Sequence, residues 1–307
     1  MRSPPCDCRV RNSPSMQQQP TARGSRDRGA RAIRALALIA GLALPGVGDT
    51  QGFLSNAPYV PTPQSTVDRM LALAKVGPND FVIDLGSGDG RIPITAAKRF
   101  GARAVGIEIE ADLIEKSRFD ARWAGVADRV TFRIEDLFTT DLRPATVLTL
   151  YLFRELNIQL RPRILEQMRP GSRVVTHDWD MGEWEPDVSL VSPAPDKPVG
   201  LDRNSKVFLW YIPARMAGRW RLETSLASGR PATVTLTQEF QRFEGGLEHD
   251  GAQHKVDGRA RGSAVKFTVP GASPWSGVYE GTADDSGLRG EILRDGAVAG
   301  RFTASRL

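Results

Sequence analysis

A glycine-rich segment from Asp84 to Arg91, with the sequence DLGSGDGR, constrains the fold of this chain more than any other stretch. An apolar run of strand character precedes it, and a helical pattern follows from Ile92 to Phe100. The segment therefore predicts a strand, a tight turn and a helix. Glycines lack a Cβ atom, so the backbone can turn sharply and approach a ligand closely. The N–H groups at the start of the helix point at whatever lies on the turn.

Two classes of ligand use a turn of this kind. Dinucleotide sites have the pattern G-x-G-x-x-G, with a pyrophosphate at the helix N-terminus. Here Arg91 takes the last position, and the strand ends in the carboxylate of Asp84, which would repel a pyrophosphate but could bind an ammonium group. S-adenosylmethionine has an amino-acid end and no phosphate, so it suits this turn better. The alternatives are an unrelated α/β protein and a nicotinamide-dependent dehydrogenase, and Arg91 and Asp84 disfavour the second.

Acidic residues also end the next two apolar runs. Glu108 closes the run 104–108 and could accept hydrogen bonds from both ribose hydroxyls. Asp136 closes the run 130–136 and could accept from the adenine amino group, with Leu137 and Phe138 beside the ring. Ligands of open parallel sheets bind at the carboxyl ends of strands. The candidate cofactor-binding residues are therefore Asp84, Gly86, Ser87, Gly88, Glu108, Ile109, Asp136 and Leu137.

The alternation of strand and helix patterns predicts the fold class. Strand patterns at 147–151 and 172–178 continue the series, which indicates a parallel sheet with right-handed crossovers. Two late strands, at 188–191 and 206–212, would form an antiparallel pair and complete the sheet. We predict an α/β, Rossmann-like seven-stranded sheet over residues 57–213. Residues 217–307 alternate in polarity between turn signals, which predicts a small antiparallel all-β meander, either a sandwich or an open barrel.

From about residue 59 to 213 the chain resembles the class I S-adenosylmethionine-dependent methyltransferases, through the motifs DLGSGDGR, GIEIE and EDLF. The segment YVPTP at 59–63 and the run Trp184-x-Pro186-Asp187 resemble bacterial relatives of the mitochondrial protein-lysine methyltransferases that act on the c-subunit of ATP synthase and on the adenine nucleotide carrier. The resemblance implies that the seven-stranded sheet is a methyltransferase sheet, with S-adenosylmethionine as the cofactor and methyl transfer as the reaction. It also implies that Tyr59 closes over the cofactor; alternatively, Tyr59 only packs.

Methyl transfer to an amine requires a neutral nucleophile held in line with the methyl group. The candidate catalytic residues lie at the ends of the fourth and fifth strands: Tyr151 to orient the amine, His177 as base and Asp178 to attract a cationic lysine. Alternatively, Tyr151 only packs and His177 only hydrogen-bonds locally. We expect an amine acceptor such as a protein lysine. The Asn/Asp-Pro-Pro-Tyr run of many amine methyltransferases is replaced here by LYLF at 150–153, which weakens that expectation.

Three apolar residues after the fifth strand, Trp179, Met181 and Trp184, could form a lip that shapes the acceptor channel. Alternatively, they only cover the sheet. No metal site is predicted, because the histidines of the C-terminal segment, His249 and His254, are isolated.

The charge distribution limits the possible partners, and the N-terminal leader indicates a location. The net charge of +5 comes from the first 34 residues, where eight arginines against two aspartates give +6 and leave −1 for the rest. The folded part therefore has no basic excess for nucleic acid. Residues 1–50 read as a disordered leader containing a basic flank and an apolar run at 35–44, which is too short for a stable membrane span and is typical of a signal peptide.

Export and cofactor use point to different compartments. The leader indicates export or a periplasmic location, whereas S-adenosylmethionine is made in the cytoplasm. The alternative function is therefore a non-catalytic exported binding protein that uses its C-terminal β domain. The methyl acceptor itself is not identified by the sequence.

Overall fold

The structure is a computed structural model that describes residues 59–198, 200 and 202–307. The predicted signal peptide and the leader cysteines Cys6 and Cys8 lie outside the described residues, so export and location stay predictions. Among the helices of the described part, none is long and apolar enough to cross a membrane.

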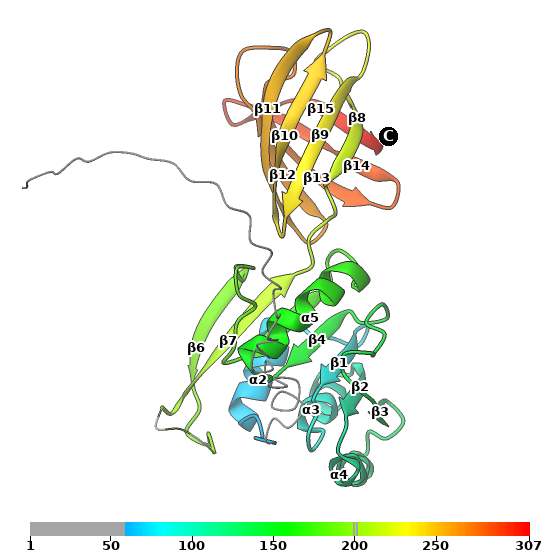
Figure 1. The fold of residues 1–307 in the computed structure, drawn as a ribbon, viewed down its shortest axis with the longest axis vertical. Helices are drawn as coiled ribbons and strands as arrows, with labels where there is room; N and C mark the ends of the chain where they lie inside the picture. The colour runs from blue at the N-terminus through cyan, green and yellow to red at the C-terminus, as the bar shows by residue number, and fades with distance from the viewer. Residues whose placement is uncertain (1–58, 199, 201) are drawn as a thin grey trace, which may run out of the picture. The chain divides into compact units, whose positions relative to one another are not determined.

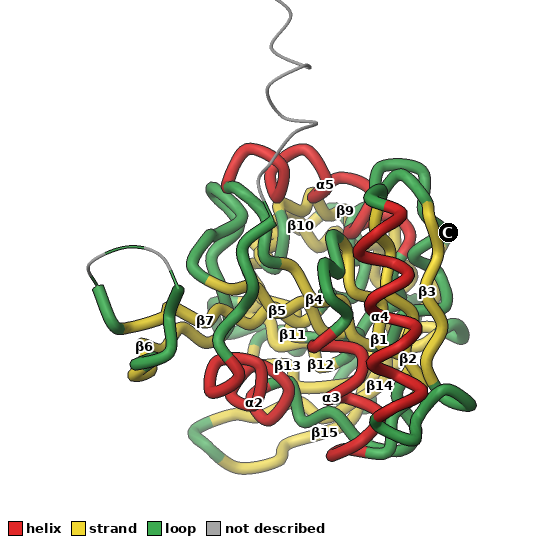
Figure 2. The backbone as a smooth tube through the Cα atoms, turned by 90° about the horizontal axis from the view of Figure 1, so that it is seen from below, coloured by secondary structure: helices red, strands yellow, loops and turns green. Residues whose placement is uncertain are grey.

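The described chain begins with strands that alternate with helices and continues with strands alone. Figure 2 distinguishes the helices (red) from the strands (yellow). The first part contains α2 (Gln64–Leu73), β1 (Phe81–Leu85), α3 (Arg91–Phe100), β2 (Arg103–Glu108), α4 (Ala111–Trp123), β3 (Val130–Ile134), β4 (Val147–Leu150), α5 (Arg154–Gln167), β5 (Arg173–His177), β6 (Val188–Pro193) and β7 (Asn204–Tyr211). The second part contains β8 (Gly218–Thr224), β9 (Ala232–Glu239), β10 (Arg242–His249), β11 (Ala252–Arg261), β12 (Ala264–Val269), β13 (Gly277–Asp284), β14 (Gly287–Arg294) and β15 (Ala297–Arg306).

The first part forms one seven-stranded sheet in the order β3-β2-β1-β4-β5-β7-β6. Strands β1 to β5 pair in parallel, and β7 runs antiparallel to both β5 and β6. This confirms the predicted fold class, including the antiparallel last pair. Because β1 is the middle one of the five parallel strands, its carboxyl end and those of its neighbours β2 and β4 meet at one edge of the sheet.

Both faces of this sheet are covered, because successive side chains of β1 enter different hydrophobic clusters. Val82 packs in one cluster with apolar residues of α2, α3 and α4. Ile83 packs in another with Leu156, Leu160 and Ile164 of α5. A strand buried on both faces reads as a continuous apolar run, which is why β1 was recognisable in the sequence.

Strands β8 to β15 close into a barrel in the order β10-β11-β12-β13-β14-β15-β8-β9 (Figure 1). Closure comes from the pairing of β8 with the last strand, β15, which places Trp220 opposite Arg306 and Leu222 opposite Ala304. The antiparallel meander is confirmed, but neither the sandwich nor the open barrel is correct. A closed barrel leaves no unpaired strand edge.

Side chains fill the inside of the barrel. An aromatic cluster lies at its centre, where Phe267 stacks on Tyr279 with ring centroids 4.5 Å apart and contacts Phe302 edge-on at 5.7 Å. The Tyr279 hydroxyl donates to the Trp275 carbonyl at 2.7 Å, so this buried polar group is satisfied. A cavity in this core measures only about 10 Å³, at the lower limit for a single water molecule. The interior is therefore packed.

The predicted domain boundaries, 57–213 and 217–307, remain predictions. In the structure β7 ends at Tyr211 and β8 begins at Gly218.

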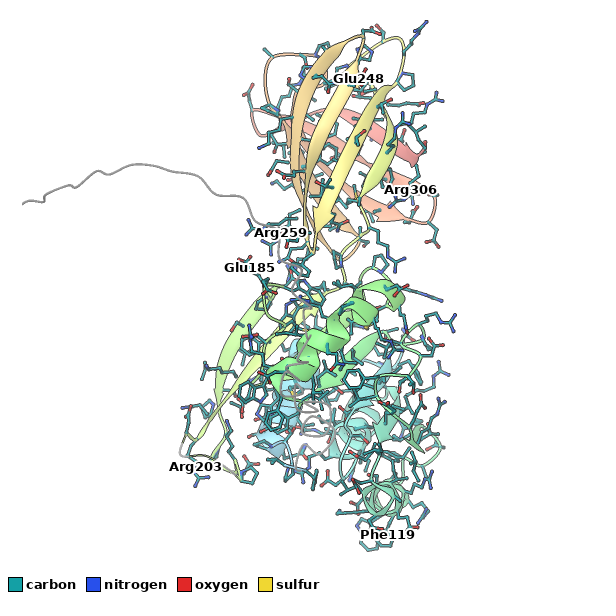
Figure 3. All side chains as sticks on the ribbon, viewed as in Figure 1. Phe119, Glu185, Arg203, Glu248, Arg259 and Arg306 are labelled. Carbon is teal, nitrogen blue, oxygen red and sulfur yellow. The ribbon has the colours of Figure 1, made fainter. Side chains whose placement is uncertain are left out.

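Replacing Phe267 by alanine should loosen the barrel. The change opens a cavity between Tyr279 and Phe302, and such cavities cost about 3–5 kcal/mol. We expect faster amide hydrogen exchange in peptides from residues 232–306, measured by mass spectrometry. Phe119→Ala is the matched control, because Phe119 is 58% exposed on α4 (Figure 3) and its loss should leave barrel exchange unchanged. Unchanged exchange in Phe267→Ala would show that the aromatic cluster does not hold the barrel together.

Candidate active site

The glycine segment forms the turn between β1 and α3 and lies against the end of β2. Gly86, Gly88 and Gly90 have φ angles of +72°, +53° and +76°. A Cβ atom on Gly90 would also lie 2.6 Å from the Phe132 ring, so no other residue fits there. The N–H groups of Gly86 and Ser87 both donate to the carbonyl of Ile107 at 2.9 Å, which fixes the turn at the carboxyl end of the sheet.

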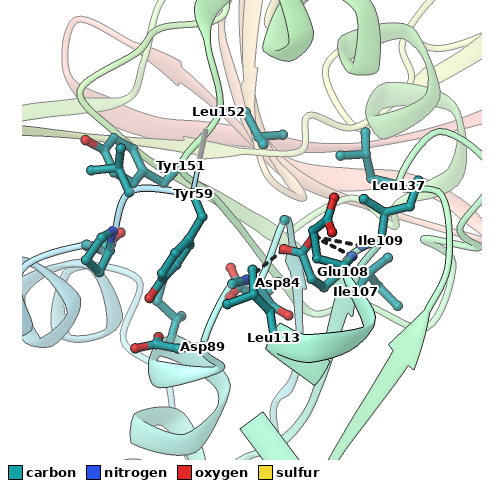
Figure 4. Close-up of a pocket in the computed structure, with 18 of the residues that line it drawn as sticks. Tyr59, Asp84, Asp89, Ile107, Glu108, Ile109, Leu113, Leu137, Tyr151 and Leu152 are labelled. Carbon is teal, nitrogen blue, oxygen red and sulfur yellow. Dashed lines mark hydrogen bonds between the residues drawn. The ribbon is translucent and has the colours of Figure 1, made fainter. Parts of the chain in front are cut away.

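A cavity of about 510 Å³ opens at this edge (Figure 4). All eight predicted cofactor-binding residues line it: Asp84, Gly86, Ser87, Gly88, Glu108, Ile109, Asp136 and Leu137. Tyr151 lines it as well, whereas His177 and Asp178 are not among its lining residues. Sequence reasoning missed the apolar wall formed by Leu113, Leu152 and Leu156, because these residues are ordinary helix and loop positions in the sequence.

Asp84 is a buried carboxylate with one unsatisfied oxygen. Its side chain is 2% exposed, and its Oδ1 accepts a hydrogen bond from the Thr149 hydroxyl at 2.5 Å. Its Oδ2 has no hydrogen-bond partner among the residues that the structure describes. Burial raises the pKa of Asp84 to about 7, with smaller contributions from Glu108 and Asp89, although the Thr149 hydrogen bond opposes the shift.

This pKa shift has a defined sign for stability. The ordinary pKa of the group is 3.8, so the unfolded chain loses this proton before the folded chain does as the pH rises. Asp84 therefore lowers the free energy of unfolding progressively between about pH 4 and pH 7. An unsatisfied oxygen on such a carboxylate, facing a cavity, fits a cationic ligand group, because an ammonium would supply both the missing hydrogen bond and the opposite charge.

Glu108, at the end of β2, holds the glycine turn. Its Oε2 accepts from the N–H of Gly88 at 2.9 Å, and its Oε1 accepts from those of Ile109 at 2.8 Å and Glu110 at 3.2 Å. Oε1 therefore already accepts two hydrogen bonds and Oε2 one, so a lone pair of Oε2 remains to accept from a hydroxyl in the cavity.

Asp136 lies two residues beyond the end of β3 and accepts from the Phe138 N–H at 2.8 Å. Phe138 and Leu137 line the cavity beside it. This corner therefore offers an exposed carboxylate beside apolar side chains, the arrangement that was predicted to surround an adenine ring.

The segment 59–62 crosses the glycine turn and is held there by Arg91. The Tyr59 ring lies directly against Gly88, where a Cβ atom would be 2.3 Å from it. Arg91 donates to Thr62 O at 2.8 Å and binds both carboxylate oxygens of Asp89, at 2.9 Å and 2.6 Å. Sequence reasoning used Arg91 only to argue against a dinucleotide. Asp89, two residues before Arg91, was the available signal for these contacts. We call the contacts of Arg91 with Asp89 and Thr62 the Arg91 clamp.

The clamp shifts the titration of its members. Burial alone would raise the pKa of Asp89, but the hydrogen bonds and charge of Arg91 outweigh it and hold that pKa below its usual range. Burial, followed by the charge of Asp89, raises the pKa of Tyr59 to about 12. The Tyr59 hydroxyl therefore keeps its proton at neutral pH.

The three predicted catalytic residues lie close together but differ in their access to the cavity. Tyr151 lines it and packs against His177, with ring centroids 3.9 Å apart. His177 is completely buried, and its Nε2 is 2.8 Å from the Ser205 hydroxyl. Asp178 pairs with Lys197 at 2.7 Å. The structure thus gives His177 and Asp178 partners within the chain, and their predicted catalytic roles stay predictions.

The pKa values of His177 and Tyr151 determine which of them carries a proton at pH 7. Burial lowers the pKa of His177 to about 4, although the nearby Asp178 opposes the shift, so the ring is neutral at pH 7. Burial and the charge of Asp178 raise the pKa of Tyr151. The Tyr151 hydroxyl can therefore orient a polar group in the cavity while it keeps its own proton.

The predicted apolar lip is only partly present. Met181 and Trp184 are buried in the core and cover the sheet, which was the alternative prediction, whereas Trp179 is 40% exposed. Among the described residues, no group of three or more histidine, cysteine or acidic side chains lies close enough to hold a metal ion.

Together, a seven-stranded sheet with an antiparallel last pair and a cavity at its carboxyl edge define a nucleoside-binding α/β protein. The cavity combines a buried carboxylate, a glycine turn and a second carboxylate, and it carries no phosphate-binding pattern. These features define the class of S-adenosylmethionine-dependent methyltransferases.

Comparisons with known proteins identify the family. Residues 84–188 match the family model of the ANTKMT methyltransferase domain. A protein-lysine N-methyltransferase of Saccharolobus islandicus is 42% identical over 135 residues, which cover 44% of this chain and 84% of that protein. The ATP synthase C-subunit lysine N-methyltransferase of Xenopus laevis is 32% identical over 130 residues, which cover 42% of this chain and 57% of that protein.

One solved structure is also similar. The RNA methyltransferase from Salinibacter ruber, in complex with S-adenosyl-L-homocysteine, is 52% identical, covers 51% of this chain and 96% of its own, and has a TM-score of 0.46. The chain belongs to the class I S-adenosylmethionine-dependent methyltransferases, in the group related to the enzymes that methylate lysine in the C-subunit of ATP synthase. Its cofactor is S-adenosylmethionine.

Replacing Asp84 by asparagine should remove the pH dependence of cofactor binding. In the natural chain the carboxyl group must lose its proton before it can bind the ammonium, so affinity should fall below about pH 7, approaching tenfold per pH unit. The Asp84→Asn chain should bind weakly with a flat profile. Calorimetric titration with S-adenosylmethionine at several pH values measures this.

The thermal midpoint of Asp84→Asn at pH 8 serves as the control. It should not fall, because the substitution removes a buried charge and keeps an oxygen for Thr149. An affinity for the natural chain that is independent of pH would contradict the assigned role of Asp84.

Proposed function

We propose that this protein transfers a methyl group from S-adenosylmethionine to the side-chain nitrogen of a protein lysine. The observation that carries the proposal is the 42% identity over most of the length of a protein-lysine N-methyltransferase. The relatives named for the C-subunit of ATP synthase support the same acceptor chemistry, although this chain spans little more than half of the Xenopus protein.

The arrangement of the cavity supports separate binding of each part of the cofactor by different residues. Bound S-adenosylmethionine supplies an electrophilic sulfonium methyl group. We propose that Asp84 holds the ammonium of its methionine end, that Glu108 accepts from its ribose, and that Asp136 and Leu137 surround its adenine. Tyr59, held by the Arg91 clamp, covers the turn from the other side.

The acceptor would enter beside Tyr151. The buried side chains of Leu152 and Leu156 line this part of the cavity and exclude water. The Tyr151 hydroxyl can accept a hydrogen bond from an amine, but neither it nor the neutral, enclosed His177 is suited to take the amine's proton. The lysine would therefore bind in its neutral form, after losing its proton to solvent.

Incubation of a cell lysate with this protein and methyl-labelled S-adenosylmethionine tests the acceptor class. We expect the label in material that protease degrades and ribonuclease leaves intact, and acid hydrolysis should release it as methyl-lysine. The Asp84→Asn chain is the matched control and should give little label at pH 7. Label in RNA or in lipid would contradict a protein acceptor.

Replacing Tyr151 by phenylalanine should slow turnover without weakening cofactor binding. The change removes the hydroxyl that orients the amine and keeps the ring that packs on His177, so kcat should fall about tenfold. Tyr211→Phe, outside the residues that line the cavity, is the control and should keep its activity. In both chains the rate should rise from about pH 7 to pH 9, because the amine must be neutral. An unchanged kcat in Tyr151→Phe would remove this residue from the acceptor site.

A further inference from the structure

Two exposed aromatic side chains, Phe153 and Trp179, lie close in the chain to the candidate catalytic residues Tyr151 and His177, but neither is among the residues that line the cavity. Phe153 follows β4 and Trp179 follows β5, and their rings meet edge-on with centroids 6.1 Å apart. Phe153 is 39% exposed and Trp179 is 40% exposed. We call this pair the aromatic lip. It adjoins the cavity in the chain, because Leu152 directly precedes Phe153 and Tyr151 precedes Leu152, and both line the cavity.

Hydrogen bonds hold the backbone at both residues. The Trp179 carbonyl accepts from the Thr176 hydroxyl at 2.5 Å and from the Asn157 amide at 3.2 Å. Phe153 is the N-cap residue of α5, and its carbonyl accepts from the N–H groups of Leu156 and Asn157. Two neighbouring aromatic rings that stay partly in water, on a backbone held by hydrogen bonds, form an apolar surface, and such surfaces mark sites of interaction.

Charges around the aromatic lip indicate the chemistry of its partner. Asp180 is paired with Arg154 at 2.8 Å and also accepts from the Gly182 N–H. Asp178 is paired with Lys197 and accepts from the Lys206 N–H at 2.9 Å. The two carboxylates that flank Trp179 in the chain are therefore matched by partners within the chain, so neither offers an uncompensated negative charge to a basic segment beside that ring. The exposed surface that remains is that of the two aromatic rings, and apolar side chains are its complement.

We propose that the aromatic lip binds apolar residues immediately flanking the acceptor lysine in the substrate protein. This inference rests on the proposed function, because it takes a lysine as the group that reaches Tyr151. The aromatic lip would then select acceptors by the residues beside the lysine, while the cavity selects the amine itself. Large aromatic anchors are the side chains that most often carry binding energy at protein interfaces.

Three seven-residue peptides with a central lysine test the proposal. Their flanks are leucine and phenylalanine in the first, serine and asparagine in the second, and aspartate in the third, and each carries the same terminal fluorophore. Binding to the full chain, saturated with S-adenosylhomocysteine, is measured by fluorescence anisotropy. We expect the apolar peptide to bind about tenfold more tightly than the other two.

The double variant Phe153→Ser with Trp179→Ser should reduce this preference to about twofold or less, because both anchors are gone. It should still fold, because serine is a favourable N-cap residue at the start of α5 and the backbone contacts at both positions remain. Its unchanged calorimetric affinity for S-adenosylmethionine would demonstrate an intact cofactor site.

Trp123→Ser is the matched control. Trp123 is 86% exposed at the end of α4, and it lies about 15 Å along that helix from the cavity-lining Leu113. This variant should keep the full preference for the apolar peptide. Equal binding of the three peptides, a preference for the polar or acidic peptide, or a preference that survives in the double variant would overturn the proposal.

Methyl transfer to the same peptides separates this inference from the proposed function. Tight binding of the apolar peptide without methylation of its lysine would leave the aromatic lip supported and contradict lysine as the acceptor. Methylation of all three peptides at equal efficiency, with equal binding, would support the proposed function and reject the aromatic lip.

Discussion

The burial of the Asp84 carboxylate near the end of β1 is the constraint on which the rest of the site depends. A buried charge with one free oxygen is unfavourable, and the strands beside it are arranged around that group. On one side Asp84 is opposite Thr149 of β4, whose hydroxyl satisfies Oδ1. On the other side it is opposite Gly106 of β2. A side chain at Gly106 would collide with Phe132 and Ser87, so this glycine makes room for the turn.

The second constraint is that the turn needs support from outside its own sequence. Three left-handed glycines make it flexible in the unfolded chain and costly to order. Glu108 supports it from β2 through the Gly88 N–H, and Arg91 ties it to Thr62. These two charged side chains thus hold the backbone as well as facing the cavity. Loss of either should therefore affect the shape of the site beyond the loss of one ligand contact.

Much of the fold could be predicted from the sequence because its signals are local. Strands β1 and β4 read as continuous apolar runs, since they are buried on both faces. The closed barrel could not be predicted in the same way. A strand with alternating polarity has the same pattern in a sandwich, an open barrel or a closed one. Closure depends on the pairing of β8 with β15, which lie at opposite ends of the segment.

The site shows the same division between local and distant determinants. Asp84 and Glu108 could be placed because a residue at the end of a parallel strand lies at the ligand edge. His177 ends a strand as well, but its ring is enclosed by Ser205 from β7, which arrives from 28 positions further along the chain. Asp178 adopts a left-handed φ of +61° and pairs with Lys197. Nothing in the sequence around the fifth strand encodes either partner.

The charges of the two sides of the cavity differ in a way that fits its two substrates. On the cofactor side, the Asp84 carboxylate keeps an oxygen unpaired, which favours a cation that arrives with its charge. Around Tyr151, the Asp178 carboxylate, which does not line the cavity, is paired with Lys197, and Tyr151 and His177 are uncharged at neutral pH. Beside Tyr151, the proposed lysine acceptor would gain little interaction energy in its protonated form and would lose much hydration energy. In its neutral form it would lose less hydration energy. The pairing of Asp178 with Lys197 thus favours, for the proposed lysine acceptor, the neutral form that methyl transfer requires, and the predicted attraction of a cationic lysine by Asp178 stays a prediction.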